Sequence, residues 1–165
     1  MLVTNIFQGT PDLGLRTIER VYDEVETVVA IKDDVHGEFA RKMTAMVHEK
    51  WAAFSGGGKQ AHLEIAPYGS IGFMSTFIMF QPRVTTDYWD AIQRGNCDRA
   101  GKVVEDHDWP FMDYIMHLQG GLDTGIHGVL ELYGTTQRWR RNPYHSLDDQ
   151  EMERLRNFFE ARGWL

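Results

Sequence analysis

The chain has 165 residues, of which 42% are hydrophobic and 12% are aromatic, and this composition suits a globular domain with a hydrophobic core. Its formal net charge of −7 would repel phosphate backbones, so we expect no nucleic-acid partner. The single cysteine, Cys97, excludes an intrachain disulfide and a cysteine-rich metal site, and it indicates a reducing compartment. We see no secretory leader, and the longest apolar run, residues 71–80, is too short for a bilayer. We therefore expect a cytoplasmic protein with no membrane contact.

Four apolar runs alternate with helical patterns over the first 95 residues. The runs are Leu2–Phe7, Val28–Lys32, 51–57 and 69–76. Because they are continuously apolar, they predict strands of a parallel sheet covered on both faces, in a series of βα units. The helices between them are marked by apolar residues at helical spacing: Leu15, Ile18, Val21 and Tyr22; Phe39, Met43, Met46 and Val47; Leu63 and Ile65; Val84, Tyr88, Trp89 and Ile92.

Beyond Gly95 the pattern predicts helices alone. One covers about 98–118, where Pro110 kinks or breaks it, and another covers 124–132. A capping box of Ser146 and Asp149 is expected to begin the last helix, which ends at Gly163. Its predicted apolar side consists of Met152, Leu155, Phe158 and Phe159. We therefore expect residues 1–95 to form βα units and residues 96–165 to form a helical C-terminal extension packed on them.

Two α/β architectures fit four βα units. One is a small open sheet, and the other is half of a TIM (β/α)₈ barrel, a fold that normally needs ~250 residues. The first strand starts at residue 2 with no helix before it. The chain therefore looks as if it enters a larger fold midway.

Lys32 ends the apolar run Val28–Lys32. Side chains alternate along a strand, so Lys32 shares a face with Ala30, and in a barrel it would lie at the mouth, where catalytic groups gather. At neutral pH only roughly one free lysine amine in a few thousand is uncharged, but a desolvated amine can attack a carbonyl and form a Schiff base. The alternative is a lysine that extends into solvent or pairs with Asp33 or Asp34.

Several segments, in this order and spacing, resemble the C-terminal half of the dihydrodipicolinate synthase / N-acetylneuraminate lyase family. They are VTN (3–5), VVAIKDD (28–34), FSGGG (54–58), GSIGFMS (69–75) and the tail 141–165. The resemblance covers essentially the whole chain. It implies a (β/α)₈ barrel in which residues 1–95 supply strands 5–8, so we expect the chain to be a fragment of a longer protein. It also implies that Lys32 forms a Schiff base with a 2-oxo acid such as pyruvate.

The resemblance also implies a set of site residues. Thr4 stands where the family has a proton-shuttling tyrosine, and we expect it to act with Lys32 as a catalytic residue by orienting a proton-relaying water. The family's carboxylate-binding arginine falls at about Gly9, so a true dihydrodipicolinate synthase is not expected. The expected substrate-binding residues are Asn5, Ser55, Gly56, Gly57, Ile71 and Gly72.

The resulting hypothesis is a lyase, either an aldolase or a dehydratase, that acts on pyruvate or a keto-deoxy sugar acid. No cofactor and no metal are expected, and the full-length protein is expected to be a homo-oligomer, a dimer or a tetramer. One alternative is an inactive or divergent barrel relative that binds a small carboxylate ligand. Another is an open-sheet domain with an exposed Lys32.

Three other motifs suggest different functions and are weaker. The segment SGGGK (55–59) fails the phosphate-loop pattern, because Ala53 and Gln60 occupy its ends. Residues 106–108, Asp-His-Asp, would point about 100° apart on a helix and cannot converge on a metal. The basic segment 138–141 is expected to be a surface loop near an oligomer interface.

Overall fold

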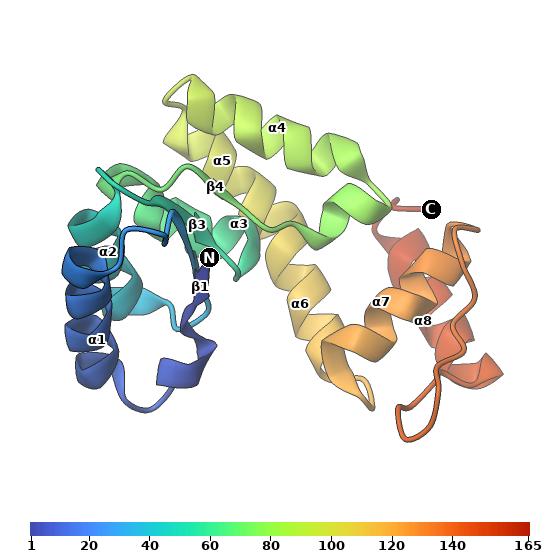
Figure 1. Cartoon of the computed structure of the whole chain (residues 1–165). Helices are drawn as coiled ribbons and strands as arrows, with labels where there is room; N and C mark the ends of the chain where they lie inside the picture. Colours follow the sequence, from blue (N-terminus) through green and yellow to red (C-terminus); the bar gives the residue numbers. More distant parts are fainter. The chain divides into compact units, whose positions relative to one another are not determined.

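The computed structural model describes residues 1–165, which form two compact units (Figure 1). The sheet unit comprises Met1–Ser75 and Tyr88–Val104, and the helical unit comprises Thr76–Asp87 and Glu105–Leu165. Helix α4 (Pro82–Gln93) contributes residues to both units. The division of the chain at residue 95 into a half barrel and an extension stays a prediction.

The sheet unit is built on four parallel strands in the order β1-β2-β3-β4. The strands are β1 (Leu2–Val3), β2 (Ala30–Asp33), β3 (Ala52–Ser55) and β4 (Gly72–Phe73). The connections contain η1 (Thr4–Phe7), α1 (Pro11–Glu24), α2 (Gly37–Val47), α3 (Gly58–Ile65) and η2 (Ala66–Tyr68). Sequential strand order with a helix in each crossover is the winding of consecutive βα units in a (β/α)₈ barrel, which confirms the predicted series.

One face of this sheet carries the core of the unit. Ile31 of β2 and Ala53 of β3 are fully buried, and they pack in one cluster with Ile18, Phe39, Met43, Val47 and Trp51. Residues 39, 43 and 47 lie on one side of α2 because they are four apart. On the opposite face of the sheet, Ala30, Lys32, Ala52 and Phe54 are only half-buried. The prediction that both faces would be covered therefore holds for one face, as expected for strands whose other face belongs to a barrel interior.

The second half of α4 packs within the sheet unit next to β4. The rings of Phe73 and Tyr88 lie 4.9 Å apart edge to face, and His62 lies 5.2 Å from Phe73. His62 Nδ1 is 2.8 Å from the Tyr88 hydroxyl, which donates to the carbonyl of Lys59. Burial lowers the pKa of His62 to about 4, so this histidine is a neutral part of the packing.

The helical unit contains η3 (Thr76–Met79), α6 (Trp109–Met116), α7 (Gly121–Leu132) and α8 (Asp149–Ala161). The predicted helix over 98–118 is divided: α5 (Cys97–Val103) is followed by a π-helical turn, η4 (Val104–Asp108), before α6. Pro110 lies in the first turn of α6, where its missing N–H costs nothing. The core holds an aromatic cluster of Phe77, Phe80, Phe111, Phe159 and Trp164. None of the helices combines the length and the apolar character that crossing a bilayer requires.

The predicted capping box of the last helix is wrong by two residues. Asp148 is the N-cap of α8: its side chain accepts from the Glu151 amide at 2.7 Å, and the Glu151 carboxylate accepts from the Asp148 amide at 2.8 Å. Ser146 instead accepts from the Arg140 amide at 2.7 Å and so fixes the preceding loop. The predicted apolar side is confirmed for Met152, Leu155 and Phe159, which are buried.

Candidate functional site at the carboxyl end of β2

Lys32 lies next to last in β2, on the half-buried face of the sheet. The strand register places it in one row with Val3 of β1, Phe54 of β3 and Gly72 of β4. Residues paired across parallel strands point to the same side, so the side chains flanking Lys32 are apolar. The side chain of Lys32 is 21% exposed. The amine therefore lies at the carboxyl edge of the sheet, beside apolar side chains that would exclude water if another part of the protein covered them.

Asp34 binds this amine with both carboxylate oxygens. Each oxygen lies 2.7 Å from Lys32 Nζ, and the Asp34 side chain is 19% exposed. Gly56, the residue after β3, makes room for the pair. A Cβ atom at residue 56 would lie 1.9 Å from Asp34 Oδ1 and 2.7 Å from Lys32 Cε. The ion pair therefore requires a glycine at residue 56, and the predicted role of Gly56 in substrate binding stays a prediction.

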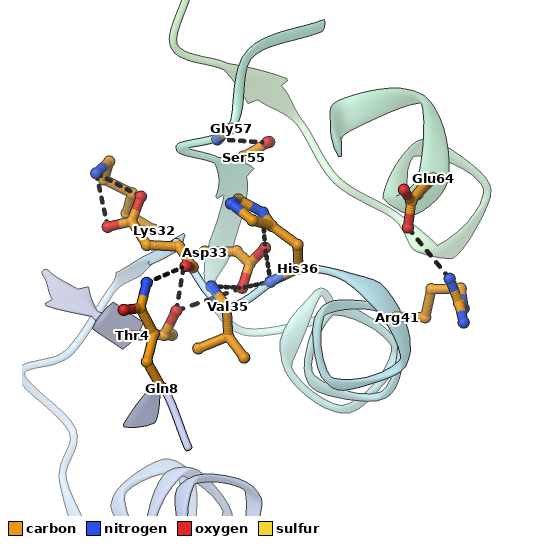
Figure 2. Close-up of polar contacts among 11 residues, drawn as sticks. Thr4, Gln8, Lys32, Asp33, Val35, His36, Arg41, Ser55, Gly57 and Glu64 are labelled. Atoms are coloured by element: carbon orange, nitrogen blue, oxygen red, sulfur yellow. Dashed lines mark hydrogen bonds and ion pairs between the residues drawn. The ribbon is translucent and has the colours of Figure 1, made fainter. Parts of the chain in front are cut away.

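Asp33 points to the other side of β2 and is fully buried (Figure 2). It accepts hydrogen bonds from the Thr4 hydroxyl at 3.3 Å, from the Val35 amide at 3.1 Å and from the His36 amide at 3.2 Å, and its Oδ2 is 3.2 Å from His36 Nδ1. Burial would raise the pKa of Asp33, but the hydrogen bonds from the His36 ring and from the two amides outweigh it and lower the pKa. The hydrogen bond to Asp33 in turn raises the pKa of His36, against the smaller opposing effect of burial.

His36 occupies the N-cap position of α2 and has an unusual backbone conformation, φ 70° and ψ −178°. This region is essentially restricted to glycine and costs an ordinary residue roughly 1–3 kcal/mol. Gly57 gives the ring its space, because a Cβ atom at residue 57 would lie 2.4 Å from His36 Cε1. The bonds between His36 and Asp33 thus hold a strained turn directly after the lysine strand.

Thr4 and Ser55, two predicted site residues, lie with Asp33 on the helix-covered side of the sheet. Both side chains are fully buried. The Thr4 hydroxyl accepts from the Asp34 amide at 2.8 Å while it donates to Asp33, and the Ser55 hydroxyl accepts from the Gly57 amide at 3.1 Å. Both hydroxyls are thus engaged in shaping the loops around Lys32. The predicted roles of Thr4 in proton relay and of Ser55 in substrate binding stay predictions.

The remaining predicted residues are spread along the sheet. Asn5 is exposed in η1, directly after β1. Gly72 shares the row of Lys32, two strands and roughly 10 Å away. Ile71 precedes β4, is 60% exposed and donates its amide to the carbonyl of Ala53. The structure therefore brings Lys32 together with Gly56, and places Ile71 and Gly72 at the far edge of the sheet.

Two arginines of the basic segment 138–141, in the helical unit, have structural partners. Arg138, in the basic segment, is buried and pairs with Glu131 at 3.4 Å and with Asp149. The prediction that this segment is a surface loop is therefore wrong for Arg138. Arg140 lies over the ring of Tyr144 at 4.5 Å. No group of three or more histidine, cysteine, aspartate or glutamate side chains is placed to hold a metal ion.

Two contacts around Lys32 could not be assigned from the sequence. The segment KDD gives Lys32 two acidic neighbours, and alternation along a strand does not decide which of them bends back to the amine after the strand ends. The missing side chain of Gly56 leaves the space beside Lys32 that the Asp34 carboxylate occupies. The pairing of His36 with Asp33 depends on a positive φ that histidine rarely adopts, so no sequence signal identified it.

Comparisons with known proteins agree with this architecture. A model of the dihydrodipicolinate synthetase family matches residues 2–162, whereas no curated protein matches the chain. Similar solved structures include dihydrodipicolinate synthases from Thermotoga maritima (TM-score 0.77, 18% identity, 91% of this chain and 51% of that chain) and Oceanobacillus iheyensis (0.77, 19%, 91% and 51%). A prophage protein of this family from E. coli K12, solved in complex with pyruvate, gives a TM-score of 0.75 at 18% identity over 94% of this chain and 52% of that chain.

The chain thus spans about half the length of the solved structures it matches. Its four parallel strands and sequential crossovers correspond to half of their fold, which confirms the predicted half of a TIM barrel. The family model matches nearly the whole sequence, from residue 2 to residue 162. The chain therefore belongs to the dihydrodipicolinate synthetase family.

Proposed function

We propose that the full-length protein is a Schiff-base-forming lyase, an aldolase or a dehydratase, which acts on a 2-oxo acid such as pyruvate or a keto-deoxy sugar acid. The observation that carries the proposal is the place of Lys32 at the carboxyl end of β2, on the half-buried face of the sheet. In a barrel this is the mouth, where catalytic groups gather. Family membership supports a reaction of this type, and the pyruvate bound to the E. coli relative supports a 2-oxo acid as the substrate class.

In this reaction the Lys32 amine attacks the 2-carbonyl carbon of the substrate. A carbon–nitrogen bond forms, water leaves, and the resulting iminium withdraws electrons from the neighbouring bond, so that a carbon–carbon bond breaks or a hydroxyl group is lost. The substrate carboxylate would be bound by Asn5 and by backbone amides of the loops that follow the strands. The proposed binding set remains Asn5, Ser55, Gly56, Gly57, Ile71 and Gly72.

The proposal concerns the full-length protein because the solved relatives are about twice as long as this chain. We propose that further βα units cover the face that carries Lys32, Phe54 and Val3. Covering this apolar row would desolvate the amine, and desolvation favours its uncharged, nucleophilic form. A homo-oligomeric assembly and a cytoplasmic location are part of the same proposal.

A second candidate function is a divergent relative that binds a small carboxylate without turnover. The specific observation in its favour is the ion pair with Asp34, which occupies the Lys32 amine at two distances of 2.7 Å. Such a protein would be stabilised against heat by a 2-oxo acid, and this stabilisation would survive Lys32→Ala. If Lys32→Ala abolishes both binding and turnover, this second function is excluded.

The test of the first function is reductive trapping. Full-length protein incubated with pyruvate and borohydride is expected to gain the mass of one reduced adduct, because borohydride reduces the imine to a stable amine. Lys32→Arg should lose the adduct, whereas Lys42→Arg, a matched change at a lysine that is 60% exposed, should keep it. Absence of an adduct with a broad set of 2-oxo acids, or an equal adduct in Lys32→Arg, would contradict the proposal.

A further inference from the structure

The carboxylate of Asp34 is the acidic group best placed to exchange a proton with Lys32. Both of its oxygens lie 2.7 Å from Nζ, and both side chains are mostly buried. The neighbouring carboxylate, Asp33, points to the other side of β2, where Thr4, Val35 and His36 occupy it. Of the two adjacent aspartates, only Asp34 is in contact with the amine.

The backbone of Asp34 is fixed from two sides, which holds its carboxylate in place. Its amide donates to the Thr4 hydroxyl at 2.8 Å, and its carbonyl accepts from the Gln8 side chain at 3.1 Å. Both partners lie in the segment directly after β1 (Figure 2). Gly56 lies directly against the carboxylate, because a Cβ atom at residue 56 would collide with Asp34 Oδ1. A surface ion pair between flexible side chains would have none of these restraints.

A Schiff-base lysine needs a group that accepts and returns protons, because an ammonium cannot attack a carbonyl. The side chains that flank Lys32 in its row, Val3 and Phe54, cannot do this. The Thr4 hydroxyl lies on the other side of the sheet and is engaged by Asp33 and by the Asp34 amide. The carboxylate in contact with Nζ is therefore the proton carrier that the described site offers.

We propose that Asp34 is the general acid–base catalyst of imine formation at Lys32 and that Thr4 is a positioning residue for Asp34. The proposal rests on the proposed Schiff-base function. It gives the acidic residue after the lysine strand a chemical role, and it replaces the predicted proton relay through Thr4 by one through a carboxylate.

The proton transfers balance as follows. Asp34 takes one proton from the ammonium, and the amine adds to the 2-carbonyl carbon, which leaves a negative charge on oxygen. Asp34 returns that proton to the oxygen, takes a second proton from the nitrogen and delivers it to the hydroxyl group, which departs as water. The products are the iminium, one water molecule and the carboxylate of Asp34 in its starting state, so no other reactant is consumed.

The experiment measures the rate of imine formation with pyruvate by borohydride quenching of full-length protein. Asp34→Asn keeps the size of the side chain but cannot carry protons, so we expect the rate to fall by at least about 100-fold, the usual scale of general acid–base catalysis. Added formate, a small carboxylate, is expected to restore part of the rate in this variant. The matched control Asp23→Asn, at an exposed aspartate of α1, should react like wild type.

A rate of imine formation that does not fall in Asp34→Asn would overturn the inference. If Asp34 only held the amine in its charged form, Asp34→Asn would release the amine, and imine formation would be unchanged or faster. Asp34→Glu is the second variant if Asp34→Asn does not fold: it keeps the charge but moves the carboxylate, so its rate should fall at least about 10-fold. A rate equal to wild type would overturn the role of Asp34.

The two proposals fail in different ways. A wild-type protein that gives no adduct contradicts the Schiff-base function, and the inference fails with it. A normal wild-type adduct together with a rate for Asp34→Asn that is not reduced, or that is reduced and not rescued by formate, overturns the role of Asp34 alone.

Discussion

The three consecutive residues Lys32, Asp33 and Asp34 point in different directions and make different contacts. Lys32 points to the half-buried face, Asp33 points to the helix-covered face, and Asp34 returns to the amine once the strand has ended. Strand alternation explains the first two directions. The third depends on Gly56, whose missing side chain leaves room for the carboxylate. The direction of the Lys32 side chain was therefore predictable from the strand, whereas the contact of Asp34 with the amine was not.

The pairing of His36 with Asp33 predicts a pH-dependent stability. The pKa of His36 is raised in the folded chain, so the stabilisation is fully present below the unfolded value of about 6.5 and is lost as the pH rises through the folded value. His36→Gly removes the ring but relieves the positive φ. We expect this variant to be less stable than wild type near pH 5.5 and to recover relative to wild type near pH 8.5, where the ring is neutral.

The measurement for this prediction is the free energy of unfolding from denaturant titrations of both proteins at the two pH values. The charges of Asp34 and Glu64 also act on His36, so the change with pH reports the ring together with its three acidic neighbours. Groups that do not interact with His36 keep their surroundings, and their titration cancels in the difference. A difference in stability between the two proteins that does not change with pH would contradict the assigned ion pair.

At the scale of the elements, the residue patterns predicted which side of a helix faces the core better than they predicted where the helix begins and ends. The predicted apolar residues of α1, α2 and α8 lie on one side of each helix, because spacing of three and four residues determines a side of a helix. In α1 and α2 that side is only partly buried at Leu15, Val21, Tyr22 and Met46, which pack against the core. The boundaries were harder to predict. The first apolar run gives only two strand residues before η1, and Ser146 and Asp149 matched a capping pattern that Asp148 and Glu151 form instead. The capping signature asks for Glu or Gln three residues after the N-cap, a condition that Asp148 and Glu151 meet and that Ser146 and Asp149 do not.

The capping box of α8 gives a direct test of this correction. Asp148→Ala removes the acceptor for the Glu151 amide, so we expect it to lower the free energy of unfolding by about 1 kcal/mol. Gln150→Ala, an exposed change in the first turn of the same helix, should alter it by less than about 0.5 kcal/mol. Equal effects of the two substitutions in denaturant titrations would show that Asp148 is not the cap.

At the scale of the whole molecule, the sheet unit has the construction of a part of a barrel. Its strands follow one another in order, and one face carries the core, while several apolar side chains of the unit remain more than half exposed: Ile6, Val29, Ile71 and Met74. The sequence predicted this architecture because each βα unit has its own local pattern. It could not predict how Lys32 is surrounded, because the row beside the amine is formed by residues far apart in the chain.

The most direct measurement of the central claim is to determine which lysine reacts. The chain has five lysines, Lys32, Lys42, Lys50, Lys59 and Lys102. If reactivity followed exposure alone, Lys42, with a side chain 60% exposed, would be modified before Lys32, at 21%. Peptide mapping of full-length protein, reduced with borohydride in the presence of limiting pyruvate, should find the adduct on Lys32 and little on the others. An adduct that appears first on Lys42, or that is spread evenly over the exposed lysines, would contradict the account.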